Sequence, residues 1–106
     1  MVKFILMSIV IFSASVRAQD RILSLGELQS HSTAADCWTL IDQNVYDITS
    51  YLSEHASAHE YSLVKWCGKD SSAAWKDKDG KAKPHSRKAE NLLRKYRIGK
   101  IASVRN

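Results

Sequence analysis

The sequence predicts an α+β fold in which several short helices pack on a small β-sheet. Two β-prone segments, residues 38–41 and 45–48, flank a turn-like Asp-Gln-Asn and predict a β-hairpin. Before the C-terminus, apolar residues recur at helical spacing and predict an amphipathic helix. These residues are Ala89, Leu92, Leu93 and Tyr96. A chain of 106 residues without internal repeats or an interdomain linker is expected to form one domain.

Capping residues place the first helices. Ser24 and Glu27 fit a capping box, which predicts a short helix over residues 25–31, followed by a loop over residues 32–36. After the hairpin, Thr49 is a suitable N-cap for a brief helix. The predicted hairpin therefore lies between two short helices.

A second capping box begins the next helix. It is formed by Ser57 and Glu60, and the helix should end at Gly68 because glycine readily adopts the positive φ of a helix C-terminus. Asp70 or Ser71 should cap a further helix.

The last part of the chain alternates between loop and regular structure. Residues 77–84 combine charges, glycine and proline, so they are expected to form a loop. Ser86 should cap the C-terminal helix. Residues 97–101 are expected to form no more than an edge strand, because the segment is short.

The first 18 residues are typical of an export signal. Lys3 gives a positive start, residues 4–12 form a short apolar run, and Ala18 offers a small residue for cleavage. A membrane anchor is the weaker alternative, because a spanning helix needs roughly 20 apolar residues. We expect a signal peptide over residues 1–18 and a mature, soluble domain over residues 19–106.

Charge is divided unevenly along the chain. Residues 20–64 hold seven acidic residues and one basic residue, a net charge of −6, whereas residues 65–106 hold thirteen basic and four acidic residues, a net charge of +9. Such a dipole can orient a charged partner as it approaches. Basic tracts also mark nucleic-acid-binding proteins, but no aromatic stacking platform or known binding motif accompanies them here. Nucleic acid is therefore not an expected partner.

Cys37 and Cys67 are the two cysteines of the chain. An even pair in an exported protein favours a disulfide. It would close a loop of about 30 residues and stabilise the fold by roughly 3.5 kcal/mol. The alternative is a pair of buried free thiols, because each cysteine adjoins a tryptophan in an apolar context (Cys37-Trp38 and Trp66-Cys67).

Two of the four histidines, His55 and His85, lie where loops meet apolar helices. A six-coordinate haem needs two neutral imidazoles on opposite faces of one porphyrin and apolar walls around the ring; histidines on separate loops satisfy this geometry. His31, at the end of a helix, is expected to be a surface or capping residue. No Cys-x-x-Cys-His motif occurs, so a haem would be held without thioether links. From the residues alone, haem and no cofactor are about equally supported.

Zinc is a weaker alternative to haem. His55 and His59 are four residues apart with Glu60 beside them, which could make a metal site. This pair opens a helix instead of lying within one, and no further ligands have suitable spacing. Zinc therefore ranks well behind haem.

Four segments of the chain carry a family likeness. They are Asp36-Cys37-Trp38 followed by Val45-Tyr46-Asp47-Ile48-Thr49; Tyr51-Leu52-Ser53-Glu54-His55; Cys67-Gly68-Lys69-Asp70-Ser71-Ser72-Ala73-Ala74-Trp75; and His85-Ser86 with Leu92-Leu93-Arg94-Lys95-Tyr96-Arg97-Ile98-Gly99. Through them, residues 23–101 resemble the cytochrome b5 family. The details Trp66-Cys67-Gly68 and Pro84-His85-Ser86 are most similar to its small exported bacterial members, of the cytochrome b-558 type.

The resemblance implies a cytochrome b5-like fold, with a small mixed β-sheet and two helix pairs that clamp one non-covalent haem b. His55 and His85 would be the axial iron ligands, and Ser86 would hydrogen-bond a haem propionate. The other residues implied to line the pocket are Tyr51, Leu52, Leu63, Trp75, Leu92 and Tyr96, with Ile41 and Ile48 below them.

Two features depart from the family pattern. The usual His-Pro-Gly-Gly is here His55-Ala56-Ser57-Ala58, which lacks a rigid proline and two glycines, so this loop is expected to take another path and His59 could compete as a ligand. The loop before His85 is longer than usual and bears lysines, which favours redox partners with acidic surfaces. These lysines are Lys76, Lys78, Lys81 and Lys83.

The sequence therefore predicts a soluble, exported b-type haem protein that passes single electrons to redox partner proteins and is a monomer, not an enzyme. Saturated iron coordination argues against oxygen chemistry. The alternative is a haem-free or ligand-binding interaction module of the same fold, and haem carriage is a third possibility. The protein would be periplasmic in a bacterium and secreted or luminal in a eukaryote.

Overall fold

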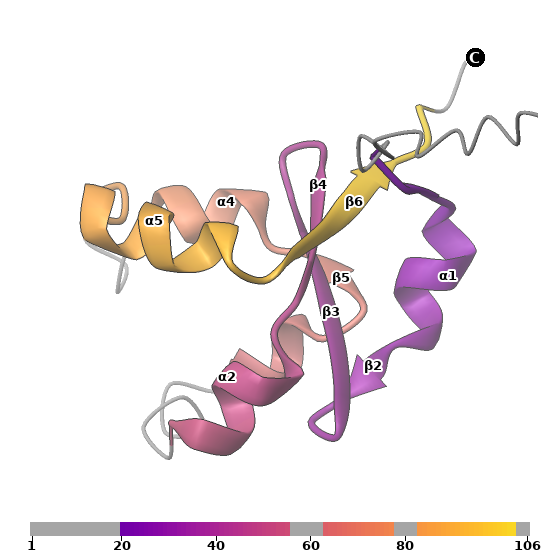
Figure 1. Cartoon of the computed structure of the whole chain (residues 1–106), viewed down its shortest axis with the longest axis horizontal. Helices are drawn as coiled ribbons and strands as arrows, with labels where there is room; N and C mark the ends of the chain where they lie inside the picture. The colour runs from indigo at the N-terminus through magenta and orange to yellow at the C-terminus, as the bar shows by residue number, and fades with distance from the viewer. Residues whose placement is uncertain (1–19, 56–62, 78–82, 104–106) are drawn as a thin grey trace, which may run out of the picture.

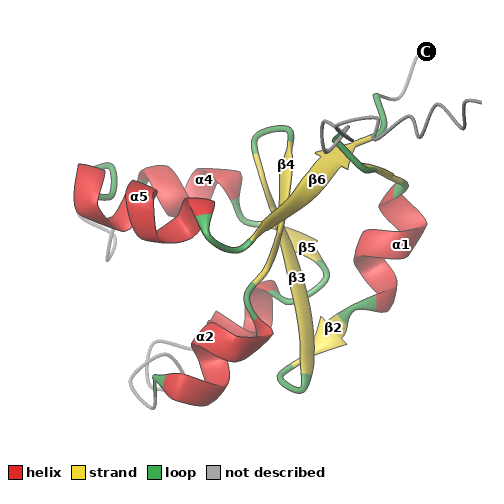
Figure 2. Ribbon diagram, viewed as in Figure 1, coloured by secondary structure: helices red, strands yellow, loops and turns green. Residues whose placement is uncertain are grey.

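The computed structural model describes residues 20–55, 63–77 and 83–103. A β-sheet runs through the middle of the molecule, with α2, α4 and α5 on one side and α1 on the other (Figures 1 and 2). The predicted α+β architecture is confirmed. In chain order the elements are β1 (Ile22–Leu23), α1 (Leu25–Ser30), β2 (Ser32–Thr33), β3 (Asp36–Ile41), β4 (Asn44–Asp47), α2 (Thr49–Glu54), the 3₁₀ helix η1 (Leu63–Trp66), β5 (Lys69–Asp70), α4 (Ser72–Lys76), α5 (Arg87–Arg94) and β6 (Arg97–Ile101).

The sheet is mixed and has the strand order β1-β6-β4-β3-β2, with β5 paired to β3 off this path. The antiparallel hairpin of β3 and β4 is the predicted one, with Ile41 opposite Asn44. Asp42 in its turn has a φ of 55°, in the left-handed region that aspartate tolerates in tight turns. The two-residue strands β1 and β5 pair in parallel with β6 and β3.

Two strand predictions were wrong. Residues 97–101 do not form an edge strand, because β1 adds beyond β6 and places it between β1 and β4. Residues 32–36 are not all loop, because β2 folds back antiparallel on the start of β3. Strands of two residues show no alternating pattern in the sequence, so only their tertiary pairing reveals them.

The capping boxes and caps behave mostly as expected. The Ser24 hydroxyl accepts a hydrogen bond from the Glu27 backbone N–H at 3.0 Å, and the reciprocal contact completes the box at the start of α1. The Ser86 hydroxyl accepts from the Ala89 N–H at 3.2 Å and begins α5. The capping box predicted at Ser57 lies outside the described residues.

One helix start differs from the prediction in detail, and another agrees with it. Thr49 is the first residue of α2 and not its N-cap. Its hydroxyl donates to the Asp47 carboxylate at 2.6 Å and accepts from the Cys37 N–H at 2.8 Å, which ties α2 to the hairpin. At α4, the Asp70 carboxylate caps by accepting from the Ser72 N–H at 2.9 Å, whereas the hydroxyl of Ser71, the N-cap residue, makes no capping bond.

Two buried clusters pack the helices against the sheet. One joins β1, α1 and the hairpin through Leu23, Leu28, Trp38, Leu40 and Val45. The second contains Cys37, Leu52 and Cys67, which are at most 2% exposed. The predicted disulfide joins Cys37 and Cys67 within it, with Cα atoms 4.7 Å apart. The bridge fixes the end of η1 to β3. No described helix is long and apolar enough to cross a bilayer.

Gly68 ends the η1 segment with a φ of 76°, as the sequence predicts for a glycine at a helix end. A Cβ at this position would lie 2.8 Å from the Ser32 Cβ and 3.2 Å from the Gln29 carbonyl oxygen. Gly68→Ala should therefore lower the free energy of unfolding by about 2–3 kcal/mol, from left-handed strain and overlap together. Chemical denaturation measures this loss.

Gly26→Ala is the matched control. Gly26 lies inside α1, and the nearest atom to an added Cβ is the Ser24 Oγ at 3.8 Å. Alanine there should raise the free energy of unfolding by up to about 1 kcal/mol, because it restricts the unfolded chain and favours the helix. Equal effects of the two substitutions on the free energy of unfolding would show that position 68 does not require glycine.

Candidate functional site

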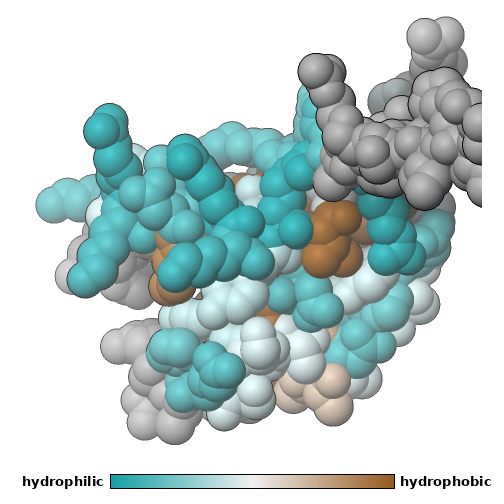
Figure 3. Space-filling view, in the orientation of Figure 1, coloured by the Kyte–Doolittle hydropathy of each residue, from teal (hydrophilic) through white to brown (hydrophobic). Residues whose placement is uncertain are grey.

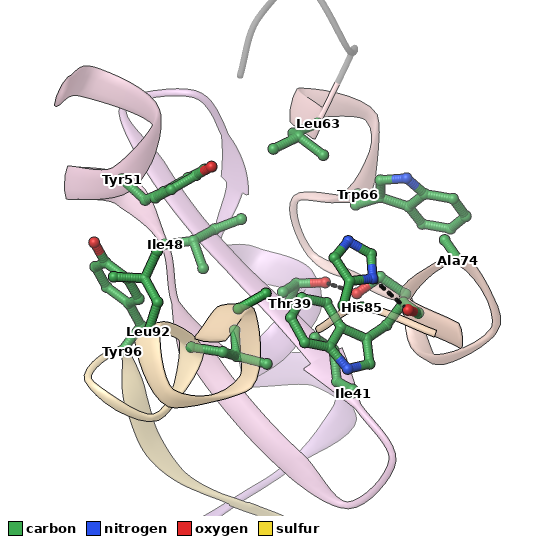
Figure 4. Close-up of a pocket in the computed structure, with 14 residues that line it drawn as sticks. Thr39, Ile41, Ile48, Tyr51, Leu63, Trp66, Ala74, His85, Leu92 and Tyr96 are labelled. Carbon is green, nitrogen blue, oxygen red and sulfur yellow. Dashed lines mark hydrogen bonds between the residues drawn. The ribbon is translucent and has the colours of Figure 1, made fainter. Parts of the chain in front are cut away.

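A pocket lies between the sheet and the helices α2, η1, α4 and α5 (Figure 4). Its cavity volume is about 210 Å³, below the roughly 300–1,000 Å³ of typical small-molecule and cofactor sites, and the cavity is open to solvent. The surface of the pocket is mostly apolar and aromatic. Its lining consists of Thr39, Ile41, Ile48, Tyr51, Leu63, Trp66, Ser71, Ala74, Trp75, His85, Ala89, Leu92, Leu93 and Tyr96.

Six of the nine site residues proposed from the sequence line this pocket. They are Tyr51, Leu63, Trp75, His85, Leu92 and Tyr96. Ile41 and Ile48, which were expected below the site, line it as well. Tyr51 and Tyr96 meet edge to face with ring centroids 6.0 Å apart, so α2 and the end of α5 are in contact at one side of the pocket.

The structure places the other three predicted residues elsewhere. Leu52 is 1% exposed and packs in the cluster around the disulfide, next to the pocket wall and not in it. Ser86 is exposed and caps α5. His55 is exposed at the C-cap of α2 and is not part of the pocket lining.

His85 is half-buried and held by one residue of α4 in two ways. Its Nδ1 lies 2.5 Å from the Trp75 carbonyl oxygen, and its ring stacks on the Trp75 indole with centroids 3.9 Å apart and planes 1° apart. A carbonyl oxygen only accepts hydrogen bonds, so Nδ1 carries the proton. The lone pair of Nε2 is then available to a metal.

His55 is held in a similar way by its own helix. Its Nδ1 donates to the Tyr51 carbonyl oxygen at 3.1 Å, and its ring stacks on the Tyr51 ring at a centroid distance of 4.4 Å. The same reasoning leaves the Nε2 lone pair available. Because Tyr51 lines the pocket, His55 lies one aromatic ring away from it.

Both imidazoles thus have the arrangement that metal-ligating histidines usually show, with one ring nitrogen fixed by a backbone carbonyl. Within residues 20–55, 63–77 and 83–103, no three His, Cys, Asp or Glu side chains are grouped to hold a metal ion. The described residues therefore form no all-protein zinc site. His59 and Glu60, the other members of the zinc alternative, lie outside the described residues.

Sequence reasoning missed several residues of the pocket lining. Thr39 and Ser71 add two hydroxyls to the lining, which bond to each other at 2.8 Å. The inward position of Thr39 on β3 could have been read from strand alternation, and that of Leu93 from its helical spacing. The contribution of Trp66 has no such signal, because it depends on how the disulfide places η1. The other missed residues are Ala74 and Ala89.

His31 has the structural role that was expected of it. It is the C-cap of α1, its Nδ1 lies 2.7 Å from the Asp36 carboxylate, and its ring stacks on Trp38 at 3.5 Å. None of these three residues lines the pocket.

Comparison with known proteins assigns this fold to a family. The model of the cytochrome b5-like heme/steroid binding domain matches residues 24–102. The chain belongs to the cytochrome b5 family. A similar protein is the soluble cytochrome b558 of Ectothiorhodospira shaposhnikovii, 36% identical over 83 residues that cover 78% of this chain and 89% of the relative. Cytochrome b5 of Drosophila melanogaster is 36% identical over 75 residues, 71% of this chain, and this chain spans only 52% of that relative.

Solved structures give the same assignment. Cytochrome b558 of Ectothiorhodospira vacuolata, a prokaryotic homologue of cytochrome b5, has a TM-score of 0.67 and 37% identity over 76% of this chain and 98% of its own. Cytochrome b5 of Ostreococcus tauri virus 2 has a TM-score of 0.59 and 27% identity, with 76% and 96% covered. The predicted cytochrome b5-like fold and the similarity to cytochrome b558 are confirmed. The chain is a cytochrome b5-like haem-binding domain; its b-type cytochrome homologues bind non-covalent haem b and carry electrons.

Proposed function

We propose that this protein carries single electrons on one non-covalent haem b, whose iron His55 and His85 would hold. The observation that supports this most is the matched pair of imidazoles. Each has Nδ1 fixed by a backbone carbonyl and Nε2 available to a metal. The two histidines lie on separate elements, as two opposite faces of one haem require.

The lining of the pocket suits an apolar group. Aliphatic and aromatic side chains dominate its lining, and the hydroxyls of Thr39 and Ser71 satisfy each other and present no unpaired polar atom. Haem bound here would supply ferric–ferrous cycling. The chain's own residues would exclude water from the ring, orient the two imidazoles and hold the proton on each Nδ1. Ser86, at the N-terminus of α5, is the proposed hydrogen-bond donor to a propionate.

We also propose that residues 1–18 are a cleaved signal peptide and that residues 19–106 act as a soluble monomer in the periplasm or another exported compartment. The first 19 residues lie outside the described part of the chain. The Cys37–Cys67 disulfide supports export, because such bonds persist mainly in oxidising compartments. The protein would act as a carrier and not as an enzyme, with redox partners that present acidic surfaces.

A redox titration tests the carrier function. The purified protein, loaded with haem, should titrate reversibly as a single one-electron couple. Its ferrous form should not bind carbon monoxide, because two histidines leave no open iron position. Rapid carbon monoxide binding would contradict two protein ligands. Failure to take up haem would favour the alternative, an interaction module that binds an apolar ligand in the same pocket.

A further inference from the structure

The helix α5 has two faces of opposite character. Leu92 and Leu93 of α5 line the pocket. Tyr96, which follows the C-cap of the helix, lines it as well. Hydrophilic side chains cover the outward side of α5 (Figure 3). Lysine and arginine supply the charge of that side, at Arg87, Lys88, Arg94 and Lys95, all of them exposed. Glu90 is the one acidic residue of α5.

These four cations differ from most others in having no ion pair with a described residue. Of the other seven lysines and arginines in the described part of the chain, four pair with carboxylates at 2.6–3.9 Å, and Lys65, Lys69 and Lys83 do not. Those paired cations are Arg21, Lys76, Arg97 and Lys100. No described carboxylate pairs with the four on α5, so their charge is directed to solvent and is available to a partner.

Leu92 brings the pocket to the surface at the same place. It lines the pocket, yet it is 39% exposed. Lys88 precedes it by four residues and Lys95 follows it by three, so both are its neighbours on the helix surface. An exposed apolar residue with charged neighbours is the pattern of a small interface with an apolar centre and a polar rim.

We propose that the surface formed by Leu92, Lys88, Lys95, Arg87 and Arg94 is the docking site for a redox partner protein with an acidic face. The inference rests on the proposed electron-carrier function and adds the place of contact. A partner bound there would be separated from the pocket by the side chain of Leu92. The charges would raise the association rate with an acidic partner and lower it with a basic one.

Two other occupants fit the surface less well. A membrane-surface helix must turn a broad apolar face toward lipid, but the apolar face of α5 lines the pocket. Single-stranded nucleic acid is held by aromatic platforms, and α5 (Arg87–Arg94) has no aromatic residue. A protein with an acidic face needs only the charges and the small apolar centre.

Charge reversal on the haem-loaded protein tests the proposal. The double variant Lys88→Glu/Lys95→Glu is compared with Arg21→Glu/Lys69→Glu, which changes net charge equally at exposed positions outside α5 and the pocket lining. Stopped-flow absorbance follows electron transfer from a reduced, strongly acidic plant-type ferredoxin at low ionic strength. A strongly basic c-type cytochrome serves as the opposite probe, accepting electrons from the reduced protein.

The α5 variant should lose roughly tenfold or more of its second-order rate with the ferredoxin and most of its salt dependence, while its rate with the basic cytochrome rises. The control variant should change each rate by less than about threefold. Equal losses in both variants would show a net-charge effect and overturn the docking site. A second outcome would also overturn it. In that outcome the wild type binds phosphatidylserine vesicles or single-stranded DNA, and Lys88→Glu/Lys95→Glu abolishes this binding but leaves the ferredoxin rate unchanged. Absorption spectra and redox titration of every variant separate these outcomes from failure of the carrier function itself.

Discussion

Replacing His85 with alanine is expected to remove most of the haem affinity of this protein. His85 is the one histidine that lines the pocket among the described residues, and it is fixed there by the carbonyl and the ring of Trp75. Loss of a partner outside the ligand shell already costs a metal site roughly 10–100-fold in affinity, and loss of a ligand should cost more. Haem titration followed by absorbance measures the change, and any haem retained should be high-spin.

The control for this substitution is His31→Ala. His31 packs on Trp38 and binds Asp36 away from the pocket, so its loss should leave the haem spectrum unchanged. His55→Ala should behave like His85→Ala, although His55 lies at the exposed end of α2. If His55→Ala retained a low-spin spectrum and His59→Ala lost it, His59 would be the second ligand and our assignment would be wrong.

Removing the disulfide should cause the largest loss of stability. The bridge spans 30 residues and lies in a cluster where both cysteines are at most 2% exposed. Cys37→Ala/Cys67→Ala should lower the free energy of unfolding by roughly 3.5 kcal/mol. For a domain of this size, that corresponds to a fall in Tm of about 15–25 °C. Calorimetry of the haem-free protein measures the fall without a contribution from the ligand.

A reducing agent provides the internal control for the disulfide. It should lower the Tm of the wild-type protein by a similar amount and leave the double alanine variant unchanged. Because the bridge fixes the end of η1 to β3, the variant should also bind haem less tightly through Leu63 and Trp66. A double variant within about 1 kcal/mol of wild type would contradict a stabilising role for the bridge.

Local signals accounted for the parts of the fold that depend on neighbouring residues. The Ser24–Glu27 box, the Ser86 cap and the hairpin turn at Asp42 each follow from interactions within a few residues. The helical spacing of Leu92 and Tyr96 likewise agrees with the face of α5 that lines the pocket.

Long-range pairing accounted for what the sequence left out. The strands β1, β2 and β5 have two residues each and exist only through their partners in the sheet. The contribution of Trp66 to the pocket follows from its place beside the disulfide, which no periodicity encodes. The exposed place of His55 at the C-cap of α2, outside the pocket lining, likewise has no signal in the local sequence.

Two histidines that hold one haem iron are central to the proposed function, and the absorption spectrum of the purified, haem-loaded protein tests this most directly. We expect a sharp low-spin Soret band in the ferric form and well-resolved, split visible bands after reduction. A high-spin spectrum would show that only one histidine binds the iron. A protein that stays featureless after reconstitution with haem would contradict the haem site altogether.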